Sequence, residues 1–269
     1  MPVSEVGYVR EGLAHTREYV DRFIAELRRL DAPSWRRLTN CPPWDVQTLA
    51  AHVARSAEAY TQALERGSRG IMEPALTPEQ RARRQQEIAA QPQGQIMEYL
   101  DEAQRQLEQV VEGLLPDRIE TQGMHVYGPR DVTWFVQQRL AELAFHLWDL
   151  RVSLGLGREF DEDTARWLLP MLVESNLPVL YALAPNPVGA FGLAVEGAPD
   201  LAWRLEAGPE RMTVQPGVTA PAVIAADAAS LALLIYGRAR LNELEREGRV
   251  RVTGDRAPVD RFWETFRGP

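Results

Sequence analysis

The sequence of 269 residues contains no lysine, so all 30 of its basic side chains are arginine. This absence excludes Schiff-base chemistry on a lysine amine. The single cysteine, Cys41, excludes an intrachain disulfide, and a lone cysteine is more often a small buried residue than a nucleophile. No apolar run of about 18 residues and no signal peptide is evident. We therefore expect a cytoplasmic protein with no membrane partner.

An excess of positive charge is also lacking. The chain has 30 arginines and 38 acidic residues, which gives a net charge of −8. Proteins that bind nucleic acid or anionic membranes usually carry a basic surface, so neither partner is expected. A hydrophobic content of 45% with 25% charged residues is typical of a soluble globular protein. The length allows one large domain or two ordinary ones.

The first half of the chain has the periodicity of long amphipathic helices, with apolar residues three and four apart. The expected helices cover residues 4–30, 45–64, 95–115 and 132–154. A polar helical arm at 79–91 follows the Thr77-Pro78 cap, and a loop containing Gly123, His125 and Gly128 precedes the last helix. Four long helices with connections of varied length predict a four-helix bundle.

The pattern changes after residue 163. An apolar helix over 164–183 is followed by alternation of period two, which predicts short strands joined by Gly/Pro turns. The expected strands lie near 191–195, 201–205, 212–214, 222–225 and 249–253, with helices at 227–235 and 259–266. This half is therefore predicted to be a small α+β domain. We place the two domains at residues 1–157 and 158–269.

The helix expected at 132–154 carries an unusual polar stripe. Phe135, Arg139, Glu142, His146 and Asp149 fall on one face, with apolar rows on both sides. Such a helix is predicted to be mostly buried, with its charges facing the interior. Buried charges are costly unless they pair or bind a metal. Glu142 and His146, four residues apart, can reach one metal ion, and the simpler alternative is a stripe of salt-bridged residues.

His52, on the inner face of the second helix, is the candidate for a third ligand. Two imidazoles and a carboxylate with an open fourth position are typical of catalytic zinc, and non-haem iron uses the same set. Asp149 can orient a ligand from behind, and Arg139 can pair with Glu142 or bind a substrate carboxylate. The simpler interpretation is a satisfied core histidine and a buried ion pair. His125 is a candidate for the rim of such a site.

Two segments resemble a known family. Residues 40–56, NCPPWDVQTLAAHVARS, resemble the CPGW-T-V-x-DLAAH element of the DinB-like, mycothiol-dependent maleylpyruvate isomerase family. Residues 139–150, RLAELAFHLWDL, resemble its R-x-x-E-x-x-x-H-x-x-DL element. In the second half, ADAASLALLIYGR and RVTGD are similar to its sterol-carrier-like C-terminal domain. The sequence departs from the family pattern at Pro43 and Asp45, where glycine and threonine are usual.

The resemblance implies two domains: an N-terminal DinB-like metal-binding four-helix bundle and a C-terminal α+β sterol-carrier-like domain. His52, Glu142 and His146 match the metal ligands of the family. The implied cofactors are Zn²⁺ or another divalent metal and mycothiol or a related low-molecular-weight thiol. The implied partner is a small electrophilic or unsaturated carboxylate, and the chain is expected to be a monomer or a homodimer.

The resemblance also implies a reaction. A metal-bound thiolate would add to the conjugated double bond of maleylpyruvate, the bond would rotate, and elimination would return fumarylpyruvate. In an S-transferase the thiolate would instead stay attached to the electrophile. Arg139 and Arg238 are the expected ligands of substrate carboxylates. Two non-enzymatic alternatives remain: a carrier of a hydrophobic ligand in the C-terminal domain, and a regulatory protein that kept the bundle without activity.

Overall fold

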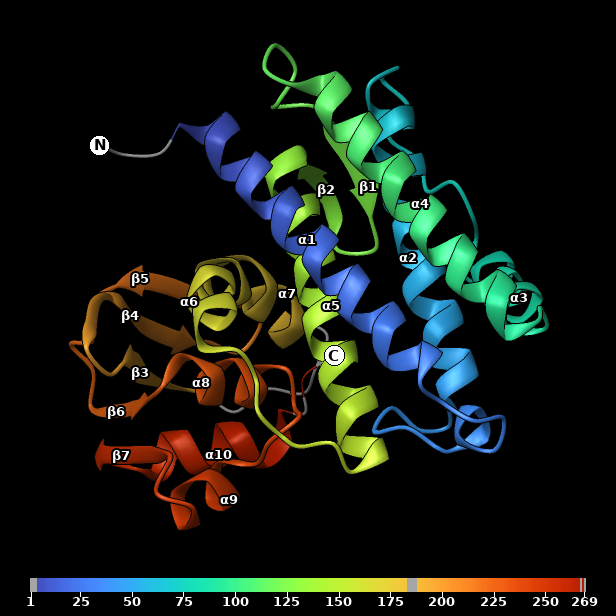
Figure 1. Cartoon of the computed structure of the whole chain (residues 1–269). Coiled ribbons are helices and arrows are strands. Elements are labelled where there is room, and N and C mark those ends of the chain that lie inside the picture. The colour runs from blue at the N-terminus through green and yellow to red at the C-terminus, as the bar shows by residue number, and fades with distance from the viewer. Residues whose placement is uncertain (1–3, 183–187, 267, 269) are drawn as a thin grey trace. The chain divides into compact units, whose positions relative to one another are not determined.

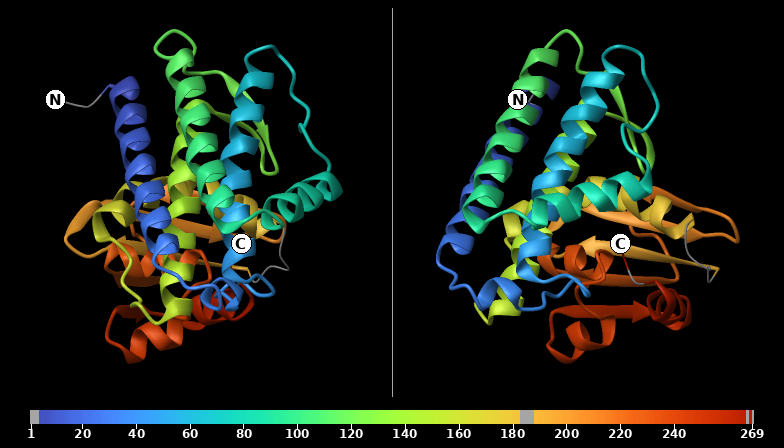
Figure 2. Two further views of the ribbon diagram at one scale, coloured as in Figure 1. Left: turned by 45° about the vertical axis from the view of Figure 1, so that its right-hand side comes forward. Right: turned by 90° about the vertical axis from the view of Figure 1, so that its right-hand side faces the viewer.

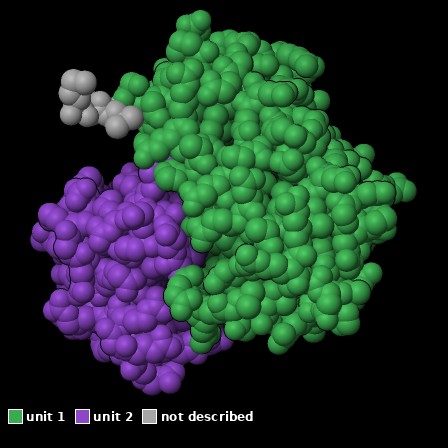
Figure 3. Space-filling model, viewed as in Figure 1, with its two compact units in different colours: residues 1–159 green, residues 160–269 purple. Residues whose placement is uncertain are grey.

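The computed structural model describes residues 4–182, 188–266 and 268, and the chain divides into two compact units (Figure 1; Figure 3). Unit 1 is Met1–Glu159 and unit 2 is Phe160–Pro269. Unit 1 is mainly helical, and unit 2 combines a sheet with helices, in agreement with the predicted fold class. Among the helices of the described residues, none has both the length and the apolarity that a membrane crossing requires.

Unit 1 is built on four long helices that run side by side (Figure 2). Their bounds are α1 Glu5–Arg28, α2 Val46–Gly67, α4 Gln93–Leu114 and α5 Val132–Leu154. Helix α1 packs against α4 and α5, and α2 packs against the same two helices. The four-helix bundle predicted from the periodicity is therefore confirmed, and α2 and α5 are neighbours within it.

Local sequence sets where α2 and α5 begin. The carboxylate of Asp45 accepts a hydrogen bond from Thr48 N at 2.8 Å, and that of Asp131 accepts one from Trp134 N at the same distance. Each N-cap satisfies a backbone N–H that has no partner inside the helix. Helix α5 ends at Gly155, whose φ of 74° is easily adopted only by glycine.

The polar stripe of α5 faces the interior, as predicted. Arg139 and Asp149 are fully buried, and the side chains of Glu142 and His146 are 19% and 9% exposed. The apolar rows on either side of the stripe are buried as well, because α5 contacts both α1 and α2. The helix thus carries charged groups into the core of the bundle, next to α2.

Two smaller elements flank α2. The predicted polar arm is α3, Pro78–Ala89, which starts at a capping box on Thr77. The prediction of a loop before α5 is wrong, because the residues there form a hairpin of β1, Gln122–His125, and β2, Gly128–Asp131. The strands are too short and too polar to give a clear alternation. Gly123 allows the hairpin to approach α2, since a Cβ there would lie 2.9 Å from the backbone of Ala63.

Unit 2 contains one five-stranded sheet of order β5-β4-β3-β6-β7. The strands are β3 Gly189–Val195, β4 Ala198–Ala207, β5 Met212–Pro216, β6 Ala222–Ala226 and β7 Val250–Gly254. Only β3 and β6 pair in parallel, and the other neighbours are antiparallel. The alternation of period two therefore predicted strands correctly, because one residue of each pair points into the core of the unit.

The helices of unit 2 pack on this sheet and on one another. They are α6 Glu162–Met171, α7 Leu177–Ala182, α8 Ala228–Ile235, α9 Leu241–Arg246 and α10 Ala257–Thr265. The apolar helix expected over 164–183 is divided by a π-helical segment, Leu172–Asn176, and its predicted last residue lies outside the described residues. Helix α8 begins at Asp227, as predicted, and α9 was not expected.

Candidate metal centre

Three side chains from α2 and α5 converge inside unit 1. His52 Nε2 lies 3.1 Å from Glu142 Oε2, and His146 Nε2 lies 3.5 Å from the same oxygen. The potential ligand atoms of the three residues all lie within 4.8 Å of one another. The α2–α5 contact therefore brings together the three residues that the sequence proposed as ligands.

The two distances to Glu142 are those expected between ligands of one metal ion. Ligands bound at about 2.0–2.1 Å in tetrahedral geometry lie roughly 3.3 Å from one another. The Nε2–Oε2 distances of 3.1 and 3.5 Å lie on either side of that value. Two imidazoles and one carboxylate also leave one position of a tetrahedral ion for a further ligand. The donor set and its spacing are thus compatible with a catalytic divalent cation.

The second ring nitrogen of each histidine, Nδ1, lies close to a side-chain oxygen of another residue. His146 Nδ1 lies 3.1 Å from Asp149 Oδ2, and His52 Nδ1 lies 3.4 Å from Gln85 Oε1. When a metal takes Nε2, each Nδ1–H can donate to the oxygen behind it, an arrangement common among metal-bound histidines. Asp149 is therefore where the sequence placed it, whereas Gln85 of α3 was not foreseen.

Burial and the mutual hydrogen bonds set the charges of this cluster. Burial lowers the pKa of His52 below 6.5, although the hydrogen bond with Glu142 opposes the shift. Burial also lowers the pKa of His146, but hydrogen bonds with Asp149, Cys41 and Glu142 outweigh it and hold that pKa well above 6.5. Burial raises the pKa of Glu142, yet the two histidines hold it well below 4.5. Near neutral pH, the metal-free cluster therefore holds a carboxylate, one imidazolium and one neutral imidazole.

The turn-rich segment before α2 contributes residues that sequence reasoning missed. Cys41 Sγ donates to Asp149 Oδ2 at 3.0 Å and lies 3.9 Å from His146 Nδ1. The ring of Trp44 lies 4.6 Å from that of His52, measured between centroids. The signal in the sequence for this contact was the position of Trp44, eight residues before His52 in the family element.

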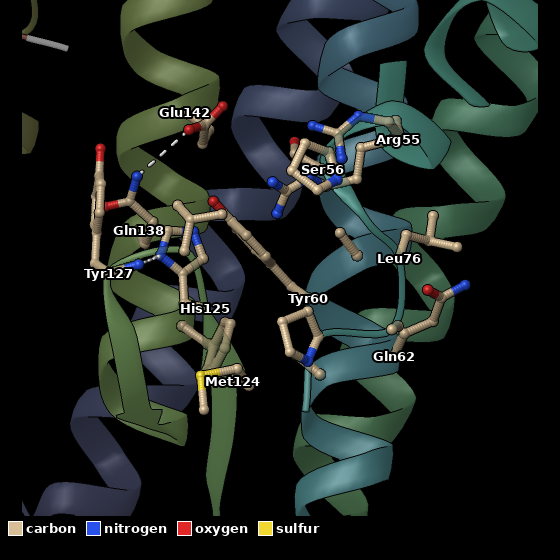
Figure 4. Close-up of a pocket in the computed structure, with 18 of the residues that line it drawn as sticks. Arg55, Ser56, Tyr60, Gln62, Leu76, Met124, His125, Tyr127, Gln138 and Glu142 are labelled. Carbon is tan, nitrogen blue, oxygen red and sulfur yellow. Dashed lines mark hydrogen bonds between the residues drawn. The ribbon is translucent and has the colours of Figure 1, made fainter. Parts of the chain in front are cut away.

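A pocket of about 820 Å³ opens beside the three convergent residues and is lined partly by His52 and Glu142. Figure 4 shows Arg55, Ser56 and Tyr60 of α2 facing Met124, His125 and Tyr127 of the hairpin region across it, with Gln138 and Glu142 of α5 alongside. The amide of Gln138 donates to Glu142 Oε1 at 3.4 Å. The candidate metal centre therefore borders a space large enough for a small molecule.

His125 lines this pocket, as the sequence suggested, and it lies within an aromatic cluster. Its ring centroid is 4.7 Å from that of Trp134 and 4.9 Å from that of Tyr127. Burial lowers its pKa to about 4, against the opposing charge of Glu142. The histidine is therefore neutral in the folded protein over the whole physiological range.

This neutral histidine predicts a pH dependence of stability. The pKa of His125 is about 4 in the folded chain and about 6.5 when unfolded, so protonation favours the unfolded chain as pH falls between these values. The contribution to the unfolding free energy is complete above about pH 6.5, and at most roughly 3 kcal/mol is lost on reaching pH 4. In urea titrations with a chelator present, His125→Phe should lose correspondingly less stability than the wild type. Parallel pH profiles for the two proteins would contradict this, and His15→Gln is the control.

Of the two arginines proposed as substrate ligands, Arg139 does not line the pocket, and Arg238 belongs to the other unit. Arg139 is fully buried and donates to Gln104 Oε1, Val53 O and Ser56 Oγ at 2.8–2.9 Å. It makes no hydrogen bond to Glu142, so its described contacts are with the framework of the bundle. Arg238, in unit 2, donates to Tyr236 O at 2.9 Å at the end of α8.

Comparison with known proteins agrees with this geometry. The crystal structure of a mycothiol-dependent maleylpyruvate isomerase superposes with a TM-score of 0.67 at 17% identity, covering 95% of each chain. A crystal structure of a histidine-to-alanine mutant of such an isomerase gives the same TM-score and coverage at 16% identity. At these identities the likeness establishes the fold alone. A comparison with curated proteins finds no match.

The family comparison goes further. Residues 16–151 match the family described as the mycothiol maleylpyruvate isomerase N-terminal domain. The matched segment is just over half of the chain and includes His52, Glu142 and His146. The resemblance read from the two sequence elements is thus confirmed, and the chain belongs to the mycothiol-dependent maleylpyruvate isomerase family, which is a family of enzymes.

Proposed function

We propose that the bundle holds a divalent cation, most simply zinc, between His52, Glu142 and His146, and that the protein isomerises a cis-unsaturated keto acid such as maleylpyruvate with the help of mycothiol or a related thiol. The observation that carries this proposal is the convergence of the three ligand atoms, within 4.8 Å of one another, at the edge of the pocket. Membership of a thiol-dependent isomerase family supports the choice of reaction.

Each residue has a part that follows from its chemistry. A cation bound here would supply the positive charge that lowers the pKa of a thiol enough to deprotonate it near neutral pH. His52 and His146 offer neutral nitrogen ligands, and the carboxylate of Glu142 offsets one of the two metal charges. Asp149 holds the ring of His146, and Gln138 holds Glu142, so that the ligands are oriented before any ion arrives.

An enclosed pocket suits an isomerisation reaction better than an open surface does. Adding a thiolate to a conjugated double bond and expelling it again needs a space in which the substrate can rotate about the resulting single bond. The lining residues Tyr60, Phe135 and Met124 form an apolar wall beside the candidate metal centre. Such a wall limits water around the reacting carbon atoms, while the polar groups of α2 and α5 fix the orientation of the substrate.

The decisive experiment is an assay of zinc-loaded protein with a panel of thiols and electrophiles that includes maleylpyruvate. We expect turnover of maleylpyruvate that requires both a low-molecular-weight thiol and the metal. A product that retains the thiol would identify an S-transferase instead. Protein that purifies without metal, and that shows no thiol-dependent reaction when zinc is supplied, would refute the proposal and favour the carrier or regulatory alternatives.

A further prediction concerns the proton on His146. Because its pKa is held well above 6.5, this ring is protonated near neutral pH and must lose a proton to bind a metal. We expect zinc binding at about pH 7 to release roughly one proton per ion, measurable by titration calorimetry in buffers of different ionisation enthalpy.

The Asp149→Asn substitution tests where that proton resides. It removes the carboxylate that raises the pKa of His146, so it should reduce the proton release and weaken zinc binding about 10- to 100-fold. Asp117→Asn, at an exposed position, is the matched control and should change neither quantity. An unchanged proton release in Asp149→Asn would mean that His146 is not its source.

A further inference from the structure

Arg55 is a partly buried cation beside the candidate metal centre that the proposed reaction has not used. It follows His52 by three residues on α2, about one helical turn, and its side chain lines the pocket (Figure 4). Its Nε is buried and has no hydrogen-bond acceptor among the described residues. A buried donor without an acceptor is unfavourable, so an acceptor supplied by a ligand would relieve a cost already present in the free protein.

A second cation of the same pocket comes from α3. Arg81 lines the pocket, and within the described part of the chain no carboxylate lies within ion-pair distance of it or of Arg55. Its neighbours on α3 differ in this respect. Arg83 lies 3.8 Å from Glu87, and Arg84 lies 3.1 Å from Glu58. Arg55 and Arg81, which line the pocket, thus differ from Arg83 and Arg84, each of which has a carboxylate within ion-pair distance.

The charge balance of the pocket favours an anion. Glu142 is the one carboxylate among its lining residues, and both histidines of the centre already lie against it. Burial lowers the pKa of Arg55, the charge of Glu142 opposes this shift without cancelling it, and the charge of Arg81 adds a smaller lowering. The whole chain has a net charge of −8, so the positive charge of these two arginines is a local feature of the pocket. Such a feature favours the binding of an anionic ligand.

We propose that Arg55 and Arg81 form a subsite for a carboxylate group of the substrate, with Arg55 as its principal donor. The subsite deepens the proposed function and rests on it, because it names the residues that orient a substrate beside the candidate metal centre. A guanidinium matches the two oxygens of a carboxylate with a pair of parallel hydrogen bonds. The carboxylate end of the substrate is held about one turn of α2 from His52.

This assignment gives the role suggested for Arg139 to two arginines that line the pocket. Arg139 is enclosed by the bundle and does not line the pocket. Arg55 of α2 and Arg81 of α3 line the pocket from two helices that pack against each other. Both belong to unit 1, so the subsite requires no residue of unit 2. Arg55 and Arg81 act on the substrate by position, and neither takes part in proton transfer.

The test uses the full-length chain and maleate, an unsaturated dicarboxylate, as a probe of carboxylate binding. Binding is measured by calorimetry for the wild type, Arg55→Gln and Arg81→Gln, with a chelator present so that no metal can hold the probe. Dimethyl maleate serves as the uncharged counterpart of the probe, and inorganic phosphate serves as a different anion. Arg83→Gln, on the same helix as Arg81 and paired with Glu87, is the matched control.

We expect Arg55→Gln to weaken maleate binding about 10- to 100-fold and Arg81→Gln to weaken it less, as the loss of a charge-assisted pair predicts. Arg83→Gln should bind maleate as the wild type does, and no variant should alter the weak binding of dimethyl maleate. The proposal is overturned if the wild type does not bind maleate, if Arg55→Gln binds it unchanged, if Arg83→Gln loses as much, or if phosphate binds more tightly than maleate.

The same variants separate this proposal from the proposed function. With zinc and thiol present, Arg55→Gln should raise KM for a carboxylate substrate while the bound zinc stays at the wild-type level. If maleate binding depends on Arg55 but no thiol-dependent turnover exists, the subsite stands and the isomerase proposal fails. If turnover exists and its KM is indifferent to Arg55, the isomerase proposal stands and the subsite is refuted.

Discussion

Replacing His52 with alanine is expected to weaken zinc binding at least about 100-fold and to remove thiol-dependent turnover, because one of the three proposed protein ligands is lost. The remaining pair, Glu142 and His146, lies on one helix and cannot enclose an ion by itself. The Nε2 of His52 is the sole ligand atom of this set from α2, at 3.1 Å from Glu142 Oε2. Metal content after purification and after dialysis against zinc measures the effect directly.

The matched control is His15→Ala, which makes the same substitution at a half-exposed histidine of α1. It should keep the metal content, the turnover and the thermal stability of the wild type. A His52→Ala protein that is folded and holds one equivalent of zinc as tightly as the wild type would show that the ligand assignment is wrong. Turnover that survives at the wild-type rate would lead to the same conclusion.

The sequence predicted those parts of the site that depend on a single helix. Glu142, His146 and Asp149 are three or four residues apart, so the helical period alone places them on one face. The apolar rows beside that face predicted its burial, because a helix that is apolar on both sides of a polar stripe has no surface to present to water. His52 could be added because it lies on the inner face of the second helix, and the inner faces of the helices of a bundle pack against one another.

The remaining parts depend on how separate segments pack, and a pattern within one segment cannot reveal this. Cys41 and Trp44 belong to an irregular segment, and its place against Asp149 and His52 follows from the tertiary fold. Likewise, the hairpin that brings His125 to the pocket reads as a loop, since its strands have four residues each. Local signals of two to four residues are too weak to distinguish such a hairpin from a turn.

Two arginines of the bundle, Arg139 and Arg55, illustrate the same limit. Arg139 and Arg55 each lie within two helical turns of a histidine of the candidate metal centre, on α5 and α2. Their roles differ because of what surrounds each. Gln104 of α4 and Ser56 of α2 provide acceptors for Arg139, whereas the Nε of Arg55 meets none among the described residues. The Nη2 of Arg139 also lacks an acceptor among the described residues, but Arg139 does not line the pocket, so the unpaired donor that a ligand can reach is that of Arg55.

Arg139→Ala is accordingly expected to lower the free energy of unfolding by about 3–5 kcal/mol, because it removes three buried hydrogen bonds, to Gln104 Oε1, Val53 O and Ser56 Oγ, and opens a cavity. Arg139→Met fills most of the volume and should lose about half as much. Urea titrations with a chelator present separate this effect from stabilisation by bound metal. Arg10→Ala, which breaks an exposed pair with Glu112, should cost less than about 1 kcal/mol.

The structural role of Arg139 also has a kinetic consequence. The folded fraction of Arg139→Met should bind substrate with the KM of the wild type, since the guanidinium is enclosed by Gln104, Val53 and Ser56 and does not line the pocket. The substrate-binding role suggested by the sequence makes the opposite prediction: a raised KM with unfolding unchanged. Measuring both quantities on one preparation decides between a side chain that holds the bundle together and one that holds the substrate.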